Sequence, residues 1–374
     1  MPNQAPHILI LSSWYPSEKN PFLGNFVERN AQLLGSKFRV TVINTQCVDG
    51  ISKNEISTTQ KGNITEITAA YPNGSTLSRF GDRSRVFSEA LNQLEDIDLI
   101  IGHVLLPHGW LFLRALRVLK SPFIWVEHGS YFRRDKKRRW LPRERLLRRR
   151  VTAGANAIVA VSETLKKDLE RTIRSENIEV IGNHIDETIF NYKAKENTGT
   201  THFLHVSTLD VNTKNPTGIF DACRLLKDKN LPFEMTIISE GDTSEWMSYA
   251  IELGIENEIS FFEAKRWNEM SEFYHRANAF VLNSEYETFS IVLAEALATG
   301  TPIISTKVGI ANELPESVII GVEKNNPNSL MEAMAKVINK EHQFDQEQIL
   351  ELAKNYHSKN ILEQWTQLIE SYVR

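Results

Sequence analysis

Short apolar runs rich in valine and isoleucine alternate with amphipathic stretches along almost the whole chain. The apolar runs of the first half cover residues 7–13, 39–45, 98–103, 123–129, 157–162 and 178–183. Those of the second half cover residues 201–208, 234–239, 258–263, 279–284, 301–306 and 317–322. Buried strands that alternate with helices form parallel sheets with helices on both faces. The pattern therefore predicts an α/β protein with doubly wound parallel sheets.

The alternation is interrupted once, by the polar segment NYKAKENTGTT at residues 191–201. Since 374 residues are too many for one hydrophobic core, we predict two Rossmann-like domains, at 1–190 and 201–357, joined by a linker at 191–200. The last stretch, 358–374, is amphipathic and is expected to form a helix that packs back toward the first domain. Ligands of such sheets bind beyond the carboxyl ends of the strands, which predicts a cleft between the two domains.

Composition favours a cytoplasmic protein. The chain has two cysteines, Cys47 and Cys223, far apart and without metal-ligand spacing, so a disulfide framework or a zinc cluster is not expected. The first residues carry an apolar run without a basic leader, which indicates a first strand rather than a signal peptide. No apolar run is long enough to span a bilayer.

Positive charge is concentrated in one segment. Residues 1–190 carry a net charge of +7 and the remainder −11, while residues 133–150 alone carry +9. Arginines there are interleaved with apolar side chains, which favours docking on an anionic membrane surface. The residues predicted to make this contact are Arg138, Arg139, Trp140, Arg148, Arg149 and Arg150. A solvated basic helix is the ordinary alternative, and nucleic-acid binding is disfavoured because no recognition module is present.

Two positions in the first half follow strands and suit ligand contacts. Gly24 precedes a helix, with Asn25 as the expected cap, and a helix N-terminus offers free backbone N–H groups to an anion. His128 follows the strand at 123–129 and is flanked by a glycine. The alternatives are an ordinary strand–helix turn and a histidine that serves only packing.

Two strand ends in the second half also suit a phosphorylated ligand. Lys214 lies just before a helix whose first turn holds Pro216, and its ammonium group could reach a phosphate. Glu263 and Lys265 follow the strand at 258–263, where backbone groups could meet a flat base. A solvated loop lysine is an equally ordinary interpretation of Lys214.

The stretch SEYETFSIVLAEALATGTPIIST, residues 284–306, places two acids in an apolar run. Glu287 lies in a loop and Glu295 lies more than one turn into the helix that follows, so the two are roughly 12 Å apart along the helix axis. That separation is too long for paired acid–base work on one bond and suits the two ends of an extended ligand. Thr288, Phe289 and Ser290 place backbone N–H groups at the helix N-terminus, which predicts an anion site.

These motifs together resemble the retaining nucleotide-sugar glycosyltransferases of family 4 (glycosyl transferases group 1), which have the GT-B fold. The resemblance covers nearly the whole chain. The segments that carry it are WYPSEKNPFLGNFVERNAQLL, ANAIVAVSETLKKDL, EVIGNHIDETIF and ETFSIVLAEALATGTPII. The last segment holds the paired glutamates and the small-residue helix that are typical of the family.

The resemblance implies a role for each position. Glu287, His128 and Lys214 would act at the transferred sugar and the diphosphate, and Glu295 would bind the ribose. The residues implied in donor binding are Gly24, Thr208, Lys214, Glu263, Lys265, Glu287, Thr288, Phe289, Ser290 and Glu295. One departure stands out, because Thr208 occupies a position where the family often has arginine. Lys265 could supply the missing charge.

The implied reaction transfers a hexose-type sugar from a nucleoside diphosphate to a hydroxyl of a glycan or a lipid-linked glycan, with retention of configuration. No cofactor or metal is expected, because the leaving diphosphate would be stabilised by Lys214 and helix N-termini. The expected partners are the nucleotide sugar, the acceptor and an anionic membrane surface at the cytoplasmic face. The alternatives are a nucleotide-sugar epimerase, a phosphorylase and a non-catalytic nucleotide-sugar-binding protein of the same fold.

Overall fold

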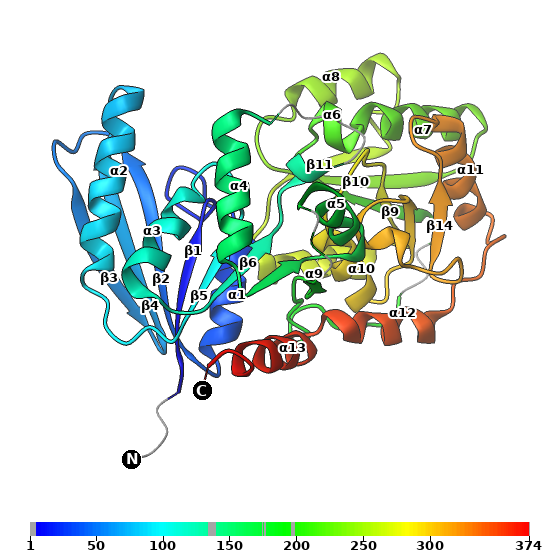
Figure 1. Ribbon diagram of the computed structural model, residues 1–374. Coiled ribbons are helices and arrows are strands. Elements are labelled where there is room, and N and C mark those ends of the chain that lie inside the picture. The colour runs from blue at the N-terminus through cyan, green and yellow to red at the C-terminus, as the bar shows by residue number, and fades with distance from the viewer. Residues whose placement is uncertain (1–4, 134–139, 174, 176, 196–198, 374) are drawn as a thin grey trace. The chain divides into compact units, whose positions relative to one another are not determined.

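The computed structural model describes residues 5–373 apart from 134–139, 174, 176 and 196–198. The chain forms two compact units (Figure 1). Unit 1 comprises Met1–Val161, Leu165–His184 and Ile361–Arg374, and unit 2 comprises Ser162–Thr164 and Ile185–Asn360.

The predicted first domain ran to residue 190, whereas residues 185–190 belong to unit 2. The reason is local contact: the Ile185 N–H donates to the Tyr356 carbonyl at 2.7 Å, and Phe190 is buried with its ring 5.6 Å from that of Trp267. A polar linker marks where periodicity stops, but it does not show to which core the preceding residues are bound.

Unit 1 is a mostly parallel sheet with helices on both faces. Its strands are β1 (His7–Ser12), β2 (Arg39–Val48), β3 (Glu55–Lys61), β4 (Ile64–Pro72), β5 (Leu99–His103), β6 (Phe123–Glu127), β7 (Ala157–Ala160) and β8 (Ile178–Val180). Its helices are α1 (Asn25–Gly35), α2 (Thr76–Leu91), α3 (Trp110–Leu119), α4 (Pro142–Gly154), the 3₁₀ turn η1 (Ser130–Phe132) and, apart from their first residues, α5 (Glu163–Ile173) and α13 (Ser358–Glu370). The strand order is β3-β4-β2-β1-β5-β6-β7-β8.

The β3–β4 hairpin was not predicted. These two strands are antiparallel and are joined by the two residues Gly62 and Asn63, with Lys61 opposite Ile64. A Gly-Asn pair between two runs of alternating polarity is a hairpin signal. The signal was missed because β3 is almost entirely exposed and therefore lacks the apolar character of the other strands.

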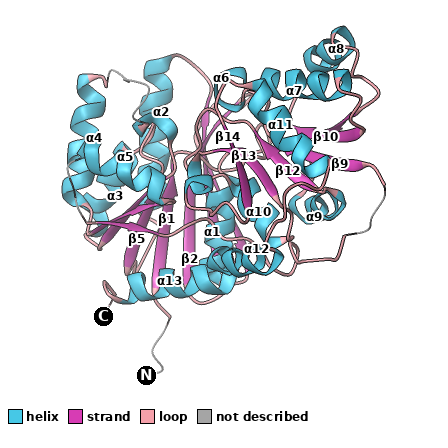
Figure 2. Ribbon diagram, turned by 90° about the vertical axis from the view of Figure 1, so that its right-hand side faces the viewer, coloured by secondary structure: helices cyan, strands magenta, loops and turns pink. Residues whose placement is uncertain are grey.

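Two helical layers cover the sheet of unit 1. Helices α1 and α13 pack on one face, where Ile361, Trp365, Leu368 and Ile369 of α13 share a core cluster with strand residues such as Ile124. Helix α3 packs on the other face, because Phe112 lies 6.0 Å (ring centroids) from Phe123, the residue before Ile124. Neighbouring strand residues point to opposite faces. Helix α3 also contacts α2 and α4, so these three helices form one layer (Figures 1 and 2).

Unit 2 is a parallel sheet in the order β11-β10-β9-β12-β13-β14. Its strands are β9 (Thr201–Val206), β10 (Phe233–Ser239), β11 (Ile259–Glu263), β12 (Ala279–Leu282), β13 (Ile303–Thr306) and β14 (Ile319–Val322). Its helices are α6 (Val211–Lys214), α7 (Pro216–Asp228), α8 (Ser244–Glu252), α9 (Trp267–Arg276), α10 (Ile291–Ala298), α11 (Pro327–Ile338), α12 (Gln346–Ala353) and the 3₁₀ turns η2 (Gly309–Asn312) and η3 (Lys354–Tyr356).

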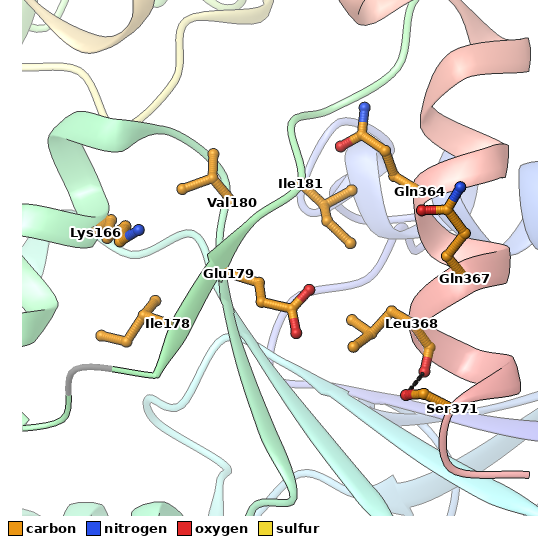
Figure 3. A pocket seen from close by; sticks show the side chains of 9 residues that line it. All are labelled: Lys166, Ile178, Glu179, Val180, Ile181, Gln364, Gln367, Leu368 and Ser371. Atoms are coloured by element: carbon orange, nitrogen blue, oxygen red, sulfur yellow. Dashed lines mark hydrogen bonds between the residues drawn. The ribbon is translucent and has the colours of Figure 1, made fainter.

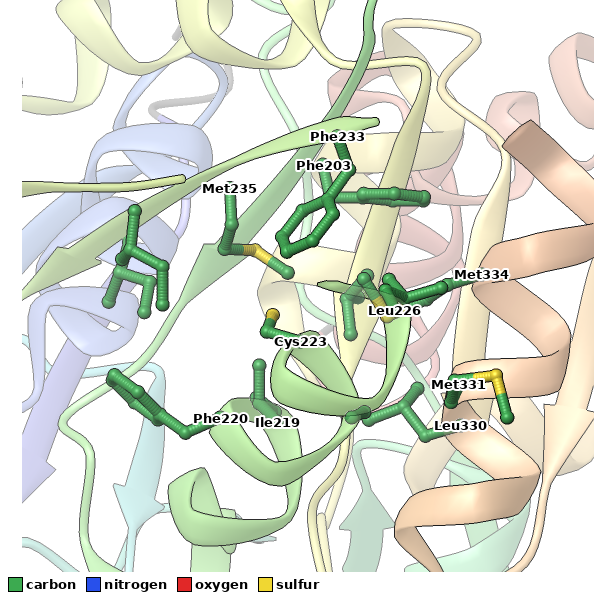
Figure 4. Packing of buried hydrophobic residues seen from close by; sticks show 14 of the residues in the cluster. Phe203, Ile219, Phe220, Cys223, Leu226, Phe233, Met235, Leu330, Met331 and Met334 are labelled. Carbon is green, nitrogen blue, oxygen red and sulfur yellow. The ribbon is translucent and has the colours of Figure 1, made fainter. Parts of the chain in front are cut away.

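The core of unit 2 lies between its sheet and helices α7 and α11. Phe203 and Met235 from the strands meet Cys223 and Leu226 of α7 and Met334 of α11 (Figure 4). This packing fixes the carboxyl ends of β9 and β12, from which the loops of the candidate site emerge.

Candidate functional site

The loop between β12 and α10 ends in an uncapped helix N-terminus. Ser290 precedes α10 with φ 77°, a left-handed conformation that is uncommon for residues other than glycine, and its side chain caps no helix N–H. Its Oγ atom is buried, and no group of the described residues hydrogen-bonds to it. In the part of the chain that the structure describes, no side chain is seen to cap the first N–H groups of α10, as an anion site requires. A strained residue at such a position is a common feature of functional sites.

Gly309 holds this loop in place from the turn after β13. The Ile310 N–H donates to the Phe289 carbonyl at 2.9 Å. A Cβ atom on Gly309 would lie 2.4 Å from that carbonyl oxygen, and the residue has φ +49°. Only glycine fits this approach without strain. The Thr288 carbonyl accepts a hydrogen bond from the Ser162 hydroxyl, so consecutive peptide groups of the loop are fixed.

Lys214 and Glu287 form an ion pair. The Lys214 Nζ atom lies 2.6 Å from Glu287 Oε1, and the Ser284 hydroxyl donates to the same oxygen at 2.7 Å. The exposed fractions of the two side chains, 22% and 12%, show that solvent still reaches the pair. The structure thus brings together two residues that the sequence placed at different strand ends, those of β9 and β12.

Glu295 is 4% exposed and is held by two donors from α9. The Tyr274 hydroxyl donates to Oε2 at 2.8 Å and the Trp267 indole N–H donates to Oε1 at 3.2 Å. Neither donor was predicted. Their spacing of seven residues on one helix, directly after the predicted base-contacting loop, is the signal that could have found them, because such residues share a helix face.

The turn after β9 is organised without an arginine. Thr208 is exposed and Leu209 has φ +53°. The Ser207 hydroxyl accepts the Leu209 N–H at 3.0 Å and lies 2.7 Å from His205 Nε2. Because His205 Nδ1 faces the Val281 carbonyl at 2.8 Å, Nδ1 carries the proton and Ser207 donates to Nε2. Burial lowers the pKa of His205 to about 4, so this ring is neutral near pH 7.

Three further charged residues lie at the ends of strands of unit 2 or in the loops that follow them. Glu263 is exposed at the end of β11, and Lys265 is half-buried two residues later. Lys324, which was not predicted, donates from the end of β14 to the Glu285 carbonyl. It therefore adds a positive charge to the loop that carries Glu287.

Gly24 caps α1 in unit 1. It has φ +72°, and a Cβ atom there would lie 2.3 Å from the Trp14 carbonyl oxygen. The predicted cap, Asn25, is instead the first helical residue. Glycine is needed here because the loop after β1 crosses the helix N-terminus at backbone contact distance.

His128 lies at the carboxyl end of β6 and is almost buried. Its ring stacks on Phe26 at 4.2 Å between centroids, and its Nε2 atom lies 3.0 Å from Nδ1 of His103. Burial lowers the pKa of His103 to about 3 and that of His128 well below its usual value. Both rings are therefore neutral near pH 7, and one of the two nitrogens donates an N–H hydrogen bond to the other.

Glu127 orders the two loops beside these histidines. Its carboxylate is fully buried and accepts the N–H groups of Leu105, His128 and Gly129 and the Tyr131 hydroxyl. Burial raises the pKa of Glu127 to about 7, although the donated hydrogen bonds oppose the rise. Sequence reasoning did not select Glu127, since an acid beside a histidine gives no sign that it is buried.

The predicted membrane-surface residues fall into three groups. Arg138 and Arg139 lie outside the described residues. Arg148 is half-buried with its guanidinium 4.7 Å from the Trp140 ring, and Trp140 packs 5.2 Å from Phe132. Arg149 and Arg150 are exposed on α4. Trp140 and Arg148 therefore pack on the body of unit 1, whereas Arg149 and Arg150 face solvent.

Unit 1 also has an open pocket of about 520 Å³ at its edge strand β8. Its lining residues are Lys166, Ile178, Glu179, Val180, Ile181, Gln364, Gln367, Leu368 and Ser371 (Figure 3). None of the predicted site residues lines it. Among the described residues, no helix is both long and apolar enough to cross a bilayer.

Two family models together match most of the chain. Residues 24–188 match the model described as Glycosyltransferase Family 4, and residues 186–357 match the model described as Glycosyl transferases group 1. The chain is a family 4 glycosyltransferase. This confirms the family that the paired glutamates and their helix resemble.

Individual relatives agree with this assignment. The glycosyltransferase MJ1178 of Methanocaldococcus jannaschii is 28% identical over 66% of this chain and 67% of its own length. The amylovoran biosynthesis glycosyltransferase AmsK of Erwinia amylovora is 27% identical over 56% of this chain, and the match spans 53% of its own length.

The structure of Anabaena HepE in complex with UDP and glucose superposes on this glycosyltransferase with a TM-score of 0.74. The match has 15% identity over 97% of this chain and 99% of HepE. At that identity the likeness concerns the fold. It confirms the predicted GT-B architecture of two doubly wound parallel-sheet domains.

Proposed function

We propose that this glycosyltransferase moves a hexose-type sugar from a nucleoside diphosphate to a hydroxyl of a glycan or a lipid-linked glycan, with retention of configuration. The observation that carries the proposal is the arrangement in unit 2. Lys214, at the end of α6, pairs with Glu287 in the loop that leads to the uncapped N-terminus of α10, and Glu295 follows on that helix. HepE, which has the same fold, was crystallised with UDP and glucose, and AmsK is named for amylovoran biosynthesis.

Each group has a chemical role in this proposal. Lys214 and the N–H groups of α10 stabilise the charge that develops on the diphosphate. Glu287 binds the transferred sugar and Glu295 binds the ribose hydroxyls. Backbone groups of Glu263–Lys265 meet the base. For Gly24 and His128 of unit 1 we retain the roles that the family resemblance implies, contact with phosphate and with sugar.

The proposed step exchanges one bond for another on the same face of the sugar. The bond from the anomeric carbon to the phosphate oxygen breaks, the acceptor oxygen bonds to that carbon, and the acceptor proton passes to the released phosphate oxygen. Because Lys214 and the α10 dipole supply positive charge, we expect turnover to persist in EDTA. Metal-dependent turnover would contradict this part of the proposal.

The direct test is product formation. Purified protein is incubated with nucleotide sugars and candidate hydroxyl acceptors, and the anomeric configuration of the product is determined by NMR. The proposal predicts a product with the donor's configuration, and loss of most turnover in Glu287→Gln. Donor binding without transfer to any acceptor would support a non-catalytic binding protein, and interconversion of the donor sugar would support an epimerase.

We further propose that the enzyme works at the anionic cytoplasmic face of a membrane. Helix α4 supports this, since Arg143, Arg145, Arg149 and Arg150 are exposed on it. Each arginine near an anionic surface adds about 1 kcal/mol to binding. Replacing Arg149 and Arg150 by glutamine is therefore expected to weaken binding to anionic vesicles roughly tenfold or more. Unchanged vesicle binding would argue against a membrane role for α4.

A further inference from the structure

The two helical layers of unit 1 differ sharply in charge. Helices α2, α3 and α4 carry ten arginines against three carboxylates, those of Asp82, Glu89 and Glu144. On the other face, α1 is neutral, with Glu28 and Arg29, and α13 carries more acids than bases. Helix α5 is balanced. The positive charge of unit 1 is thus collected on the α2–α3–α4 layer, and this layer suits an anionic partner.

Exposed apolar side chains gather at one end of the same layer. Each of these helices follows a parallel strand, so its N-terminus lies at the carboxyl edge of the sheet. Leu77 and Phe80, in the first two turns of α2, are 86% and 56% exposed. Leu141 and Leu146, at the start of α4, are 46% and 50% exposed. Neighbouring helices are 8–10 Å apart, so the two pairs are separated by roughly 20 Å across α3.

The aromatic side chain on α2, Phe80, packs against α3, the helix that lies between the two pairs. The Phe80 ring lies 4.7 Å from the ring of Trp110, the first residue of α3. This contact limits the motion of Phe80 and leaves its outer side facing solvent. On α4, Leu146 is flanked by the exposed arginines Arg145, Arg149 and Arg150. Apolar tips among arginines are the composition of a surface that enters the interface of an anionic bilayer.

We propose that unit 1 docks on an anionic lipid bilayer through two anchors, the N-terminal ends of α2 and α4, with Leu77 and Phe80 entering the interface. This inference rests on the membrane part of the proposed function and adds an apolar anchor outside the basic segment. The carboxyl edge of the sheet, which holds Gly24 and His128, is the edge that carries the anchors. A lipid-linked acceptor would therefore be presented beside them.

A lipid partner fits these residues better than a soluble glycan. A glycan site needs hydrogen-bonding groups around its aromatic platform, whereas Leu77, one turn before Phe80, and Gly81, the residue after it, are exposed and offer no polar side chain. The charged groups of α2 that closely follow Phe80 are engaged: Arg83 donates to Tyr71 and lies beside His108 Nδ1, and Asp82 pairs with Arg85. Arg79, directly before Phe80, is half-buried.

The test is flotation of the full chain with vesicles of equimolar phosphatidylcholine and phosphatidylglycerol. The variant combines Leu77→Ser and Phe80→Ser, and the matched control is Val118→Ser. Val118 is 49% exposed at the C-terminal end of α3, on the opposite edge of the layer. We expect the vesicle partition coefficient of the double variant to be lower than that of wild type by a factor of about ten or more. The control should partition like wild type.

A site-specific probe reports insertion directly. In a Cys47→Ser background, in which the remaining Cys223 is fully buried, Leu77→Cys and Val118→Cys are labelled separately with an environment-sensitive fluorophore. Anionic vesicles should raise the emission at position 77 several-fold and shift it to shorter wavelength, and should leave position 118 unchanged. This readout does not depend on the stability of the serine variant.

The outcomes separate the two proposals. If wild type does not bind anionic vesicles at all, the membrane part of the proposed function fails together with the anchor. If wild type binds but the double variant binds equally well and position 77 shows no spectral change, the α2 anchor is wrong. A double variant with normal vesicle binding and a raised KM for a detergent-dispersed acceptor would identify a glycan site and would also overturn the anchor.

Discussion

Lys214 and Glu287 are the residues on which the proposed chemistry depends most, and they are already paired. At 2.6 Å the two charges satisfy each other, so a diphosphate that approaches Lys214 competes with Glu287 for it. Glu287 keeps the Ser284 hydroxyl as a second donor. The carboxylate can therefore turn toward a sugar hydroxyl without losing all of its hydrogen bonds. In the proposed mechanism, the ion pair is a resting arrangement that the donor opens.

The first prediction concerns this pair. Lys214→Met should raise the Kd for a nucleoside diphosphate about tenfold or more, because it removes a charge from the phosphate site. Isothermal titration calorimetry measures the change. The matched control is Lys229→Met, an exposed lysine at the end of α7, which should bind like wild type. Equal affinity in both variants would show that Lys214 does not contact phosphate.

The second prediction concerns Tyr274, which fixes Glu295 through one hydrogen bond of 2.8 Å. Tyr274→Phe should weaken binding of a ribonucleoside diphosphate several-fold, since a hydrogen bond to a charged group contributes about 1.5–3 kcal/mol. Binding of the 2′,3′-dideoxy analogue should change little, because this analogue lacks the hydroxyls from which Glu295 would accept hydrogen bonds. Tyr249→Phe, which removes a hydroxyl bonded to Asp221, is the control. A parallel loss for both nucleotides would point to a purely structural role.

Among the elements, the loop before α10 depends on a close backbone approach. Gly309→Ala should lower the melting temperature and donor affinity together, since the added methyl would meet the Phe289 carbonyl and would hold an alanine at positive φ. Gly241→Ala has a comparable φ, +88°, with no atom within 4 Å of the added Cβ. Because the positive φ strains an alanine at either position, Gly241→Ala should also lower the melting temperature, but less than Gly309→Ala, and it should leave donor affinity unchanged. Equal effects of the two substitutions would show that the loop contact does not cause the losses of stability and donor affinity.

Some of these elements could be predicted from the sequence and others could not. The buried parallel strands of both units could be predicted from their apolar runs, because a strand that is buried on both faces needs apolar residues at consecutive positions. The exposed β3 strand lacks that signature. The Glu287 and Glu295 motif was visible as two acids in an apolar run, whereas the donors Trp267 and Tyr274 depend on how α9 packs on α10. Arg148 resembles its neighbours in sequence, and only the packing of Trp140 separates it from them.

At the scale of the whole molecule, buried histidines make the fold sensitive to acid. Burial lowers the pKa values of His103 and His108 to about 3 and that of His205 to about 4. The unfolded chain binds protons at these sites below pH 6.5 while the folded chain does not. Their contribution to stability is therefore complete above pH 6.5 and is lost as the pH falls toward 4. Glu127, with its raised pKa, contributes in the opposite sense between about pH 4.5 and 7.

The fourth prediction follows from these signs. Melting temperature should fall steadily from pH 6.5 to 4.5, since each net proton changes the free energy of unfolding by about 1.4 kcal/mol per pH unit. His205→Asn should show a shallower fall over this range, relative to its own value at pH 8. Differential scanning fluorimetry across the pH series measures both slopes. A variant slope as steep as that of wild type would mean that His205 does not remain neutral in the folded state.

The central claim is that unit 2 binds a nucleoside diphosphate through the α10 site, and one thermal-shift experiment tests it most directly. Nucleoside diphosphates and their sugars are added to wild type, to Glu295→Ala and to the control Glu332→Ala on the exposed side of α11. A ligand that binds only the folded protein raises its melting temperature. We predict a rise with one base family in wild type and in Glu332→Ala, and a smaller rise in Glu295→Ala. No rise with any nucleotide would contradict the account.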